Sequence, residues 1–220
     1  MKLVLASGSQ RRRELLTMCG YDYEIIVSNA DETIDENDPE SFVRALSFRK
    51  AKDVFDRLFA AGRRDFAVIG SDTVVAFQKD GETKPVIIGK PKDAKDAVRI
   101  LSMLSGKTHR VFTGVSVIAD IPDENAAAQC SIREKAEIQT ECSITEVTFE
   151  TLSPDEITDY VNSGDPLDKA GSYGIQGPFG MFVREIRGNY FTVIGMPIPV
   201  LYKMLKKIGI LPHGFYERIE

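Results

Sequence analysis

Short apolar runs and longer amphipathic stretches alternate along the whole chain. Strands are predicted where apolar residues run together or alternate, over 3–6, 66–77, 85–88, 111–117 and 132–151. Helices are predicted over 10–19, 38–61, 93–105, 153–164 and 198–208. Two further short strands are expected around Gly188-Asn189, and a polar surface loop over 120–129. This mixture predicts an α/β or α+β fold, and one domain over 1–220, since no repeat or clear linker interrupts it.

Boundary residues support the predicted helices. Asp38 is a helix-capping residue, and Pro39 after it suits the first helical turn. Residues 153–156 form a capping box, in which serine and glutamate side chains bind each other's backbone amides. Gly20 and Gly62 follow two predicted helix ends, where glycine readily adopts the left-handed conformation that terminates a helix.

The charge balance narrows the class of partner. The 220 residues include 28 Lys+Arg against 33 Asp+Glu, for a formal net charge of −5. A nucleic-acid polymer normally binds to a basic face that releases counterions, so this partner is disfavoured. A single nucleotide needs only a local basic pocket and remains allowed. No apolar run approaches the ~20 residues of a membrane span, and the start of the chain lacks the pattern of a signal peptide.

Cysteine and histidine usage indicates a reducing compartment and a hard metal. Cys19, Cys130 and Cys142 form no paired motif, which predicts free thiols and a cytoplasmic location. A disulfide between Cys130 and Cys142 is the less favoured alternative. The only histidines, His109 and His213, are too few for a histidine-rich zinc site. Any metal would be held by carboxylates and substrate phosphates, which favours magnesium or manganese.

Three arginines, Arg11, Arg12 and Arg13, stand at the start of the first predicted helix. A helix N-terminus carries partial positive charge, so cations are unfavourable there unless an anion joins them. Together with free backbone N–H groups and the hydroxyls of Ser7 and Ser9, they predict a phosphate site. The alternative is a solvated basic turn. The glycine spacing and the Lys-Ser/Thr ending of a Walker loop are absent.

Two charged residues stand in otherwise apolar patterns. Asp72 interrupts the apolar run 68–75, and a buried carboxylate is costly unless it is paired or coordinated. It is therefore expected at the edge of a cleft, as a metal ligand or to activate water, or alternatively as the cap of a turn. Lys50 shares a helix face with apolar residues, so it either extends to the surface or reaches a carboxylate or phosphate. Lys90 is a second lysine, on a loop before a proline.

The stretch 165–180 is rich in glycine, which permits close approach of backbone to a ligand. Gln176 carries an amide that can present a donor and an acceptor to a base edge. Tyr173 is expected either to stack on a ligand or to pack in the core. A flexible linker is the alternative, but the apolar residues of this stretch favour an ordered loop.

Together these features predict a site for nucleotide phosphates, without separating hydrolysis from binding. They also occur in the order of the motifs of a known family, at Leu5–Leu16, Asp31-Glu32, Lys50-Ala51, Gly70–Val75, Gly89–Pro91, Leu104–His109 and Leu167–Gly177. From residue 3 to about residue 205 the chain resembles the Maf family of nucleoside triphosphate pyrophosphatases. The resemblance implies a mixed α/β sheet with flanking helices, in two lobes around a deep nucleotide-binding cleft, like inosine triphosphatase.

Within that family the chain is similar to the subgroup that acts on dTTP and UTP, through Thr73 and the stretch 173–176. The subgroup that acts on 7-methyl-GTP typically has Trp beside the arginines, and this chain contains no Trp. Gln10 is a departure, because the family usually has Pro there; we expect a less rigid helix start and retained activity. The loop 119–143 is longer than expected for bacterial members, and the resemblance assigns it no role.

The resemblance also implies metal-dependent hydrolysis of a nucleoside triphosphate to the monophosphate and pyrophosphate. Asp72 is the expected general base or holder of the attacking water, and Glu32 and Asp72 are the expected ligands of magnesium or manganese. The residues expected to stabilise charge on the leaving pyrophosphate are Arg11, Arg12, Lys50 and Lys90. Those expected to position phosphate oxygens are Ser7 and Ser9. Those expected to read or orient the base are Arg12, Thr73 and Gln176.

Two other functions remain open at this point. One is a nucleotide-binding regulator of cell division with little catalysis, which would not need acidic residues at Glu32 and Asp72. The intact candidate positions favour the enzyme. The other is the 7-methyl-GTP specificity. Removal of non-standard nucleotides, and a link to division arrest, are expected by analogy alone. The choice between a monomer and a homodimer is also open.

Overall fold

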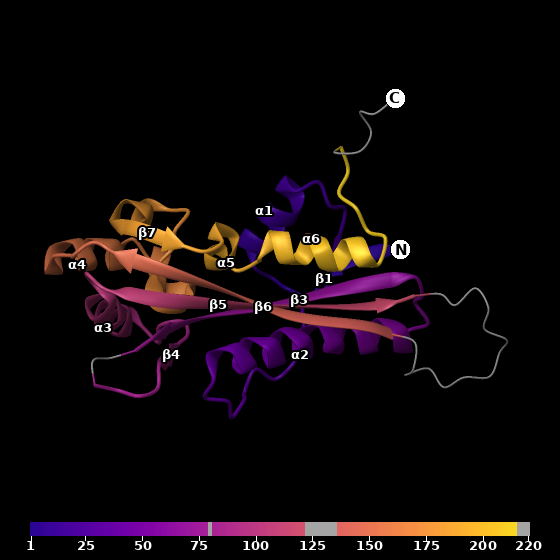
Figure 1. Cartoon of the computed structure of the whole chain (residues 1–220), viewed down its shortest axis with the longest axis horizontal. Coiled ribbons are helices and arrows are strands. Elements are labelled where there is room, and N and C mark those ends of the chain that lie inside the picture. The colour runs from indigo at the N-terminus through magenta and orange to yellow at the C-terminus, as the bar shows by residue number, and fades with distance from the viewer. Residues whose placement is uncertain (79–80, 122–135, 215–220) are drawn as a thin grey trace.

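The computed structural model describes residues 1–78, 81–121 and 136–214. Its centre is a seven-stranded mixed sheet in the order β2-β1-β3-β5-β6-β7, with β4 paired to β3 (Figure 1). β1 runs parallel to both of its neighbours, and the other pairs are antiparallel. The strands are β1 (Lys2–Leu5), β2 (Glu24–Ile25), β3 (Phe66–Phe77), β4 (Val86–Ile88), β5 (Thr108–Asp120), β6 (Ala136–Phe149) and β7 (Val183–Arg187).

Helices cover both faces and one end of this sheet (Figure 1). On one face lies α2 (Pro39–Ala60), and on the other lie α1 (Gln10–Met18), α5 (Tyr190–Ile194) and α6 (Ile198–Lys207). At the end where β7 joins the sheet are α3 (Ala94–Leu104) and α4 (Pro154–Asn162), which pack against each other. Short 3-10 helices follow α4 at Asp165–Asp168, Ala170–Ser172 and Pro178–Phe182.

The backbone of α2 approaches β3 and β5 very closely, because both strands carry a glycine beneath it. A Cβ atom at Gly70 would lie 2.1 Å from the carbonyl oxygen of Ser47. A Cβ atom at Gly114 would lie 2.2 Å from the carbonyl oxygen of Val43. Any larger residue would push the helix away. These two glycines therefore set the height of α2 above the sheet, and with it the position of Lys50.

The two largest of the four apolar clusters among the described residues, called the two cores below, lie toward opposite ends of β3. At one end Val75 and Phe77 of β3 pack with residues of α3 and α4. At the other end Ala67 and Ile69 pack with residues of α1 and α6. The stretch 70–73 lies between the two cores. The predicted mixed α/β architecture with flanking helices is confirmed. The polar centre of β3 lies at the boundary between these two cores, and the predicted pair of lobes stays a prediction.

Within the described residues, the predicted helices and long strands are confirmed, with one exception after β7. Residues 132–135 of the predicted strand 132–151 lie outside them. Two short strands were expected around Gly188-Asn189, but only β7 is a strand, and α5 begins at Tyr190. The Oδ1 atom of Asn189 accepts a 2.9 Å hydrogen bond from Phe191 N–H, which caps this helix. The two-residue strand β2 was not predicted, and both of its residues are exposed.

Some predictions fall beyond the described part of the chain. Residues 122–135, which include Cys130 and most of the predicted 120–129 loop, lie outside it. Cys19 and Cys142 are free thiols. No helix within the described residues is long and apolar enough to cross a membrane. The single domain and the cytoplasmic location stay predictions.

Candidate active site

A cleft of about 1870 Å³ opens where β1 ends beside β3. Leu5, the last residue of β1, pairs with Ile69, whereas β3 continues to Phe77, so the next residues of β3 have an open edge. Ligands of α/β proteins commonly bind at such a crevice beyond the carboxyl ends of strands. All ten predicted site residues line this cleft: Ser7, Ser9, Arg11, Arg12, Glu32, Lys50, Asp72, Thr73, Lys90 and Gln176.

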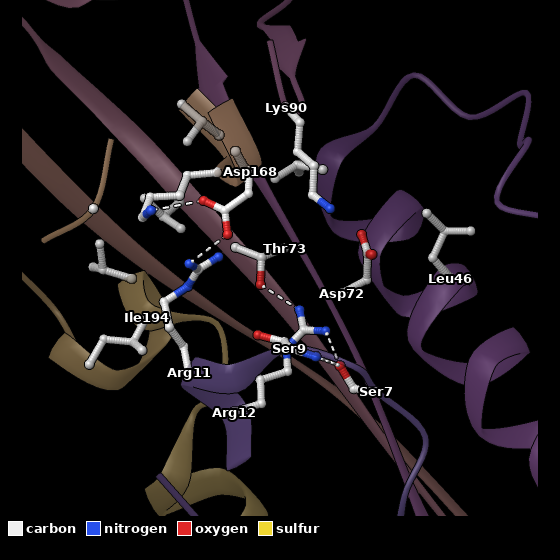
Figure 2. A pocket seen from close by; sticks show the side chains of 18 of the residues that line it. Ser7, Ser9, Arg11, Arg12, Leu46, Asp72, Thr73, Lys90, Asp168 and Ile194 are labelled. Carbon is white, nitrogen blue, oxygen red and sulfur yellow. Dashed lines mark hydrogen bonds and ion pairs between the residues drawn. The ribbon is translucent and has the colours of Figure 1, made fainter. Parts of the chain in front are cut away.

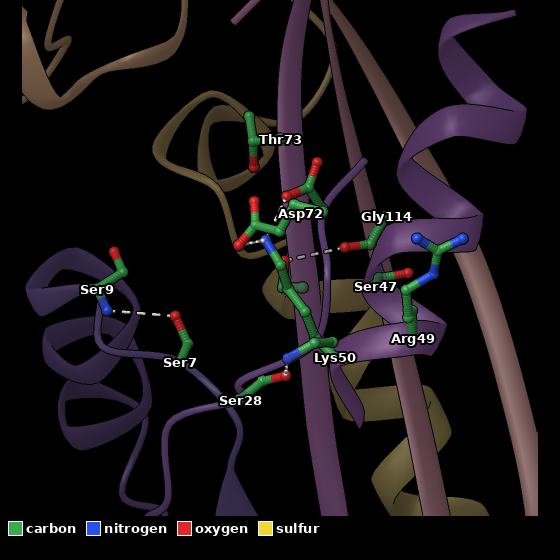
Figure 3. Close-up of polar contacts among 12 residues, drawn as sticks. Ser7, Ser9, Ser28, Ser47, Arg49, Lys50, Asp72, Thr73 and Gly114 are labelled. Carbon is green, nitrogen blue, oxygen red and sulfur yellow. Dashed lines mark hydrogen bonds and ion pairs between the residues drawn. The ribbon is translucent and has the colours of Figure 1, made fainter. Parts of the chain in front are cut away.

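Lys50 and Asp72 form a buried ion pair at the centre of the cleft (Figure 3). The Nζ atom of Lys50 donates a 2.7 Å hydrogen bond to Oδ1 of Asp72, and their side chains are only 12% and 11% exposed. Glu32 Oε1 lies 3.1 Å from the same Nζ atom. Of the two alternatives for Lys50, contact with carboxylates is the one observed. Asp72 is likewise paired at the cleft, and the turn-cap alternative is wrong.

Asp72 and its neighbour Thr73 face opposite sides of the sheet, because side chains alternate along a strand. Asp72 points to α2 and Lys50. Thr73 points to α1, where its Oγ1 atom accepts a 3.3 Å hydrogen bond from Nη2 of Arg12 (Figure 2). The open edge of β3 lets one cleft reach both faces. A single ligand can therefore contact an acidic group and a hydroxyl group from adjacent residues.

Arg12 is held in one orientation by three hydrogen bonds. Its Nε atom donates to the carbonyl oxygen of Gly195 at 2.8 Å, and its Nη1 atom donates to Oγ of Ser7 at 3.2 Å. The third bond goes to Thr73. Burial lowers the pKa of the Arg12 guanidinium below its usual value, and the negative charge of Asp72 opposes this shift. The side chain is a fixed part of the cleft wall.

Ser7 and Ser9 begin the turn that leads into α1. The Oγ atom of Ser7 accepts hydrogen bonds from Ser9 N–H and from Arg12, so its own hydrogen remains available to a ligand oxygen. Ser9 is the N-cap residue, but its side chain caps no backbone N–H. The N-terminus of α1 thus presents two hydroxyls and free amides to the cleft, as the sequence predicted for an anion site.

Arg11 reaches across the mouth of the cleft to the segment after α4 (Figure 2). Its Nη1 atom lies 3.1 Å from Oδ2 of Asp168, whose other oxygen lies 2.8 Å from Nζ of Lys169. Burial would raise the pKa of Asp168, but hydrogen bonding to Lys169 and the charge of Arg11 hold it below its usual value. A phosphate bound by Arg11 would compete with this carboxylate.

The glycine-rich stretch forms an ordered wall of the cleft, and Tyr173 packs in the apolar core beside it. The Tyr173 hydroxyl lies 3.0 Å from Nε2 of His109, and both side chains are buried. The hydroxyl of Tyr160 accepts a 3.1 Å hydrogen bond from Gly174 N–H, which fixes the next turn. Gln176 is exposed at the cleft rim.

Lys90 enters the cleft from the loop that follows β4. It is exposed, and no ion pair holds it among the residues that the structure describes. Figure 2 shows its amine pointing toward Asp72 from the side opposite Arg12. A bound anion could therefore recruit its amine.

Behind Arg12 and Thr73 lies a layer of residues that the sequence did not reveal. Gly195 follows α5 with a φ of 109°, and its carbonyl oxygen accepts hydrogen bonds from Arg12 and from Ser71. Thr113 of β5 contacts Thr73. An alternating strand pattern does not distinguish such a threonine from an ordinary core residue, and the segment of α5 was expected to be a strand.

The two carboxylates of the cleft suit a divalent cation whose other coordination positions are filled by substrate phosphates and water. The oxygens of Glu32 and Asp72 converge on one positive charge, the Lys50 ammonium. No group of three or more His, Cys, Asp or Glu able to hold a metal occurs among the described residues. Magnesium is typically bound through one or two carboxylates together with substrate phosphates and water. Glu32 and Asp72 are the residues of this cleft that could hold it.

Two bacterial proteins that share one name are similar in sequence to this chain over most of its length. A protein of Agathobacter rectalis named dTTP/UTP pyrophosphatase is 40% identical over 217 residues, covering 95% of this chain and 98% of that protein. A Bacillus thuringiensis protein of the same name is 42% identical over 210 residues, covering 95% and 96%.

Among solved structures, the Ham1 protein of Staphylococcus aureus superposes with a TM-score of 0.50 and 14% identity, over 94% of this chain and 100% of that one. At this identity the similarity concerns the fold alone. The model of the Maf-like protein family matches residues 2–208. The chain belongs to the Maf-like protein family.

Proposed function

We propose that this protein hydrolyses dTTP, UTP and related pyrimidine nucleoside triphosphates to the monophosphate and pyrophosphate. The observation that carries the proposal is the Lys50–Asp72 pair, in a cleft that also presents Arg11, Arg12 and Lys90. The name dTTP/UTP pyrophosphatase, borne by relatives at about 40% identity over most of the chain, supports the choice of substrate.

In the proposed reaction, Asp72 accepts a proton from a water molecule as its oxygen attacks the α-phosphorus. The bond from that phosphorus to the oxygen bridging to the β-phosphorus breaks, and pyrophosphate leaves. Lys50 holds the Asp72 carboxylate by a 2.7 Å hydrogen bond, which orients it from the α2 side. The other carboxylate oxygen would accept the proton from the water.

The cations of the cleft would offset the charge that grows on the leaving pyrophosphate. Arg12 and Lys50 are already held in place, by Gly195 and Asp72. Arg11 and Lys90 would join when the substrate enters, Arg11 by exchanging Asp168 for a phosphate. The hydroxyls of Ser7 and Ser9 would donate to phosphate oxygens at the start of α1.

Magnesium or manganese is part of this proposal, with Glu32 and Asp72 as its protein ligands. When bound, such an ion neutralises phosphate charge and makes water more acidic. Gln176, at the rim, and Arg12 and Thr73, in the wall, would contact the base. Removal of non-standard nucleotides and a link to cell-division arrest follow from family resemblance alone and stay predictions.

Pyrophosphate release from dTTP, UTP, CTP, GTP and 7-methyl-GTP, with and without magnesium, tests the proposal. We expect release that requires the metal and is fastest with dTTP and UTP. A preference for 7-methyl-GTP would keep the reaction and overturn the substrate. Binding without release from any nucleotide would favour a regulator of division.

A further inference from the structure

A chain of hydroxyl groups runs from the protein interior to the wall of the cleft. Oγ1 of Thr113, on β5, donates a 2.7 Å hydrogen bond to the carbonyl oxygen of Thr192, on α5. The same Oγ1 atom lies 3.0 Å from Oγ1 of Thr73, which lines the cleft. Thr113 and Thr192 are fully buried, so water cannot take the place of either partner.

The direction of each hydrogen bond in this series of groups follows from the number of hydrogens that each group can donate. A threonine hydroxyl has one hydrogen to donate and two lone pairs to accept with. Thr113 uses its hydrogen on a carbonyl oxygen, which can only accept. In the 3.0 Å contact with Thr73 it must therefore be the acceptor, and Thr73 must be the donor.

The hydrogen bond between Arg12 and Thr73 also requires that Thr73 donate to Thr113. A guanidinium has donors only, so its Nη2 atom donates to Oγ1 of Thr73 and cannot receive the Thr73 hydrogen. Thr73 therefore donates its one hydrogen to Thr113, away from the cleft. Toward the cleft its oxygen can only accept.

We infer that Thr113 is a specificity-determining positioning residue, which makes Thr73 an obligate hydrogen-bond acceptor for the base. This inference rests on the proposed function and deepens it. Uracil and thymine carry a hydrogen on ring nitrogen N3, which an acceptor can bind. Cytosine carries a lone pair on N3, which would face the lone pair of Thr73. Cytosine carries its donor hydrogens on the exocyclic N4, so it can meet this acceptor only by shifting in the pocket. The arrangement therefore favours pyrimidines with an N3–H group over cytosine.

Three substrates and one isosteric variant test this inference. The wild-type enzyme is expected to prefer UTP over CTP and over UTP methylated at N3. Thr113→Val keeps the shape of the side chain but removes its hydroxyl, so the Thr73 hydrogen can turn into the cleft and meet cytosine. The ratio of kcat/KM for UTP to that for CTP is expected to fall at least about tenfold. Thr113→Ser, which keeps the hydroxyl, should preserve the ratio.

The methylated substrate separates hydrogen-bond direction from loosened packing. In Thr113→Val, use of CTP should improve while use of N3-methylated UTP stays poor. Equal improvement of both would mean a looser pocket and would overturn the inference. An unchanged ratio of UTP to CTP in this variant would overturn it too.

Thr145 offers a matched control on the neighbouring strand β6. It is also fully buried, and its hydroxyl donates to Asn189 O at 3.0 Å and accepts from Asn189 N–H at 2.9 Å. Thr145→Val therefore removes a similar buried hydroxyl near α5 without touching Thr73. Its Tm should fall as in Thr113→Val, but its base preference should match the wild type.

Binding of UMP and CMP to the wild-type protein, measured by calorimetry, keeps the inference testable if Thr113→Val fails to fold. Tighter binding of UMP supports the inference, and equal binding overturns it. The same measurement separates it from the proposed function. Preference for UMP without release of pyrophosphate from UTP would leave the recognition of N3–H standing and remove the reaction.

Discussion

Nζ of Lys50, on α2, lies 2.7 Å from Oδ1 of Asp72, on β3, and the contact is almost closed to solvent. Either charge alone would be costly at this depth, because its lost hydration would not be replaced. The pair is made possible by Gly70, two residues before Asp72, which lets α2 settle on the strand. Gly70 thus accounts both for the close packing of α2 on β3 and for the pairing of Asp72 with Lys50.

Asp72→Asn is expected to retain the fold and nucleotide binding while lowering kcat by roughly 10²–10⁴-fold. The amide oxygen can still accept the hydrogen bond from Lys50, but it cannot take a proton from water. Pyrophosphate release and calorimetric binding of dTTP measure the two effects separately. Asp56→Asn, at an exposed residue of α2 paired with Lys52, is the control and should behave as wild type. Near-normal turnover of Asp72→Asn would remove this residue from the mechanism.

Glu32→Gln is expected to raise the magnesium concentration for half-maximal activity by about tenfold, since one of two carboxylate ligands becomes neutral. Chelation of the metal should stop the wild-type reaction, and added magnesium should restore it. Glu36→Gln provides the comparison, because Glu36 binds the Asp38 amide in the same loop and pairs with no lysine or arginine among the described residues. A metal requirement that is identical in both variants would argue against Glu32 as a ligand.

Much of the site could be predicted because its residues conflict with their local pattern. A carboxylate in an apolar strand and arginines at a helix start are costly features that a sequence reveals without any structure. Which groups relieve the conflict is decided by tertiary packing. From the sequence, Lys50 could either extend to solvent or reach a carboxylate or phosphate, and the contact of α2 with β3 shows that it reaches a carboxylate.

The layer behind the site could not be predicted, for two physical reasons. The residues 190–194 include β-branched side chains that favour a strand, but the Asn189 cap and the left-handed Gly195 make a short helix. Thr113 has the ordinary alternation of a buried strand, and its role depends on which carbonyl and hydroxyl groups it meets across the fold.

Gly195→Ala is expected to destabilise the protein by about 1–3 kcal/mol and to weaken substrate binding. The residue has a φ of 109°, which is strained for alanine. Its new Cβ atom would also lie 3.1 Å from Oγ1 of Thr73 and close to Arg12. Gly209→Ala is the matched control, because its φ is 76° but nothing lies within 4 Å of its Cβ position.

The comparison separates backbone strain from disturbance of the site. Both variants should lose stability in urea unfolding, but only Gly195→Ala should show a higher KM for dTTP. Equal KM values in the two variants would mean that the carbonyl of Gly195 does not position Arg12.

His109→Gln is expected to reduce the loss of stability that accompanies acidification. His109 is 2% exposed, and burial lowers its pKa to about 3, whereas an unfolded histidine has a pKa of about 6.5. Between these values the unfolded chain binds a proton that the folded protein excludes, so this histidine lowers the free energy of unfolding as the pH falls. Between these two pKa values, the contribution of His109 lowers the free energy of unfolding by up to roughly 1.4 kcal/mol for each pH unit of acidification.

Urea unfolding of wild type and His109→Gln from pH 7 to pH 4 measures this slope, because other titrating groups cancel in the difference. At pH 7 the variant should be the less stable, since it loses the hydrogen bond and ring contacts that His109 makes with Tyr173. As the pH falls, the gap should close, because only the wild type carries the histidine penalty. His213→Gln, at a largely exposed histidine outside both cores, is the control. A gap that stays constant over this range would show that His109 is protonated in the folded protein as readily as in the unfolded chain.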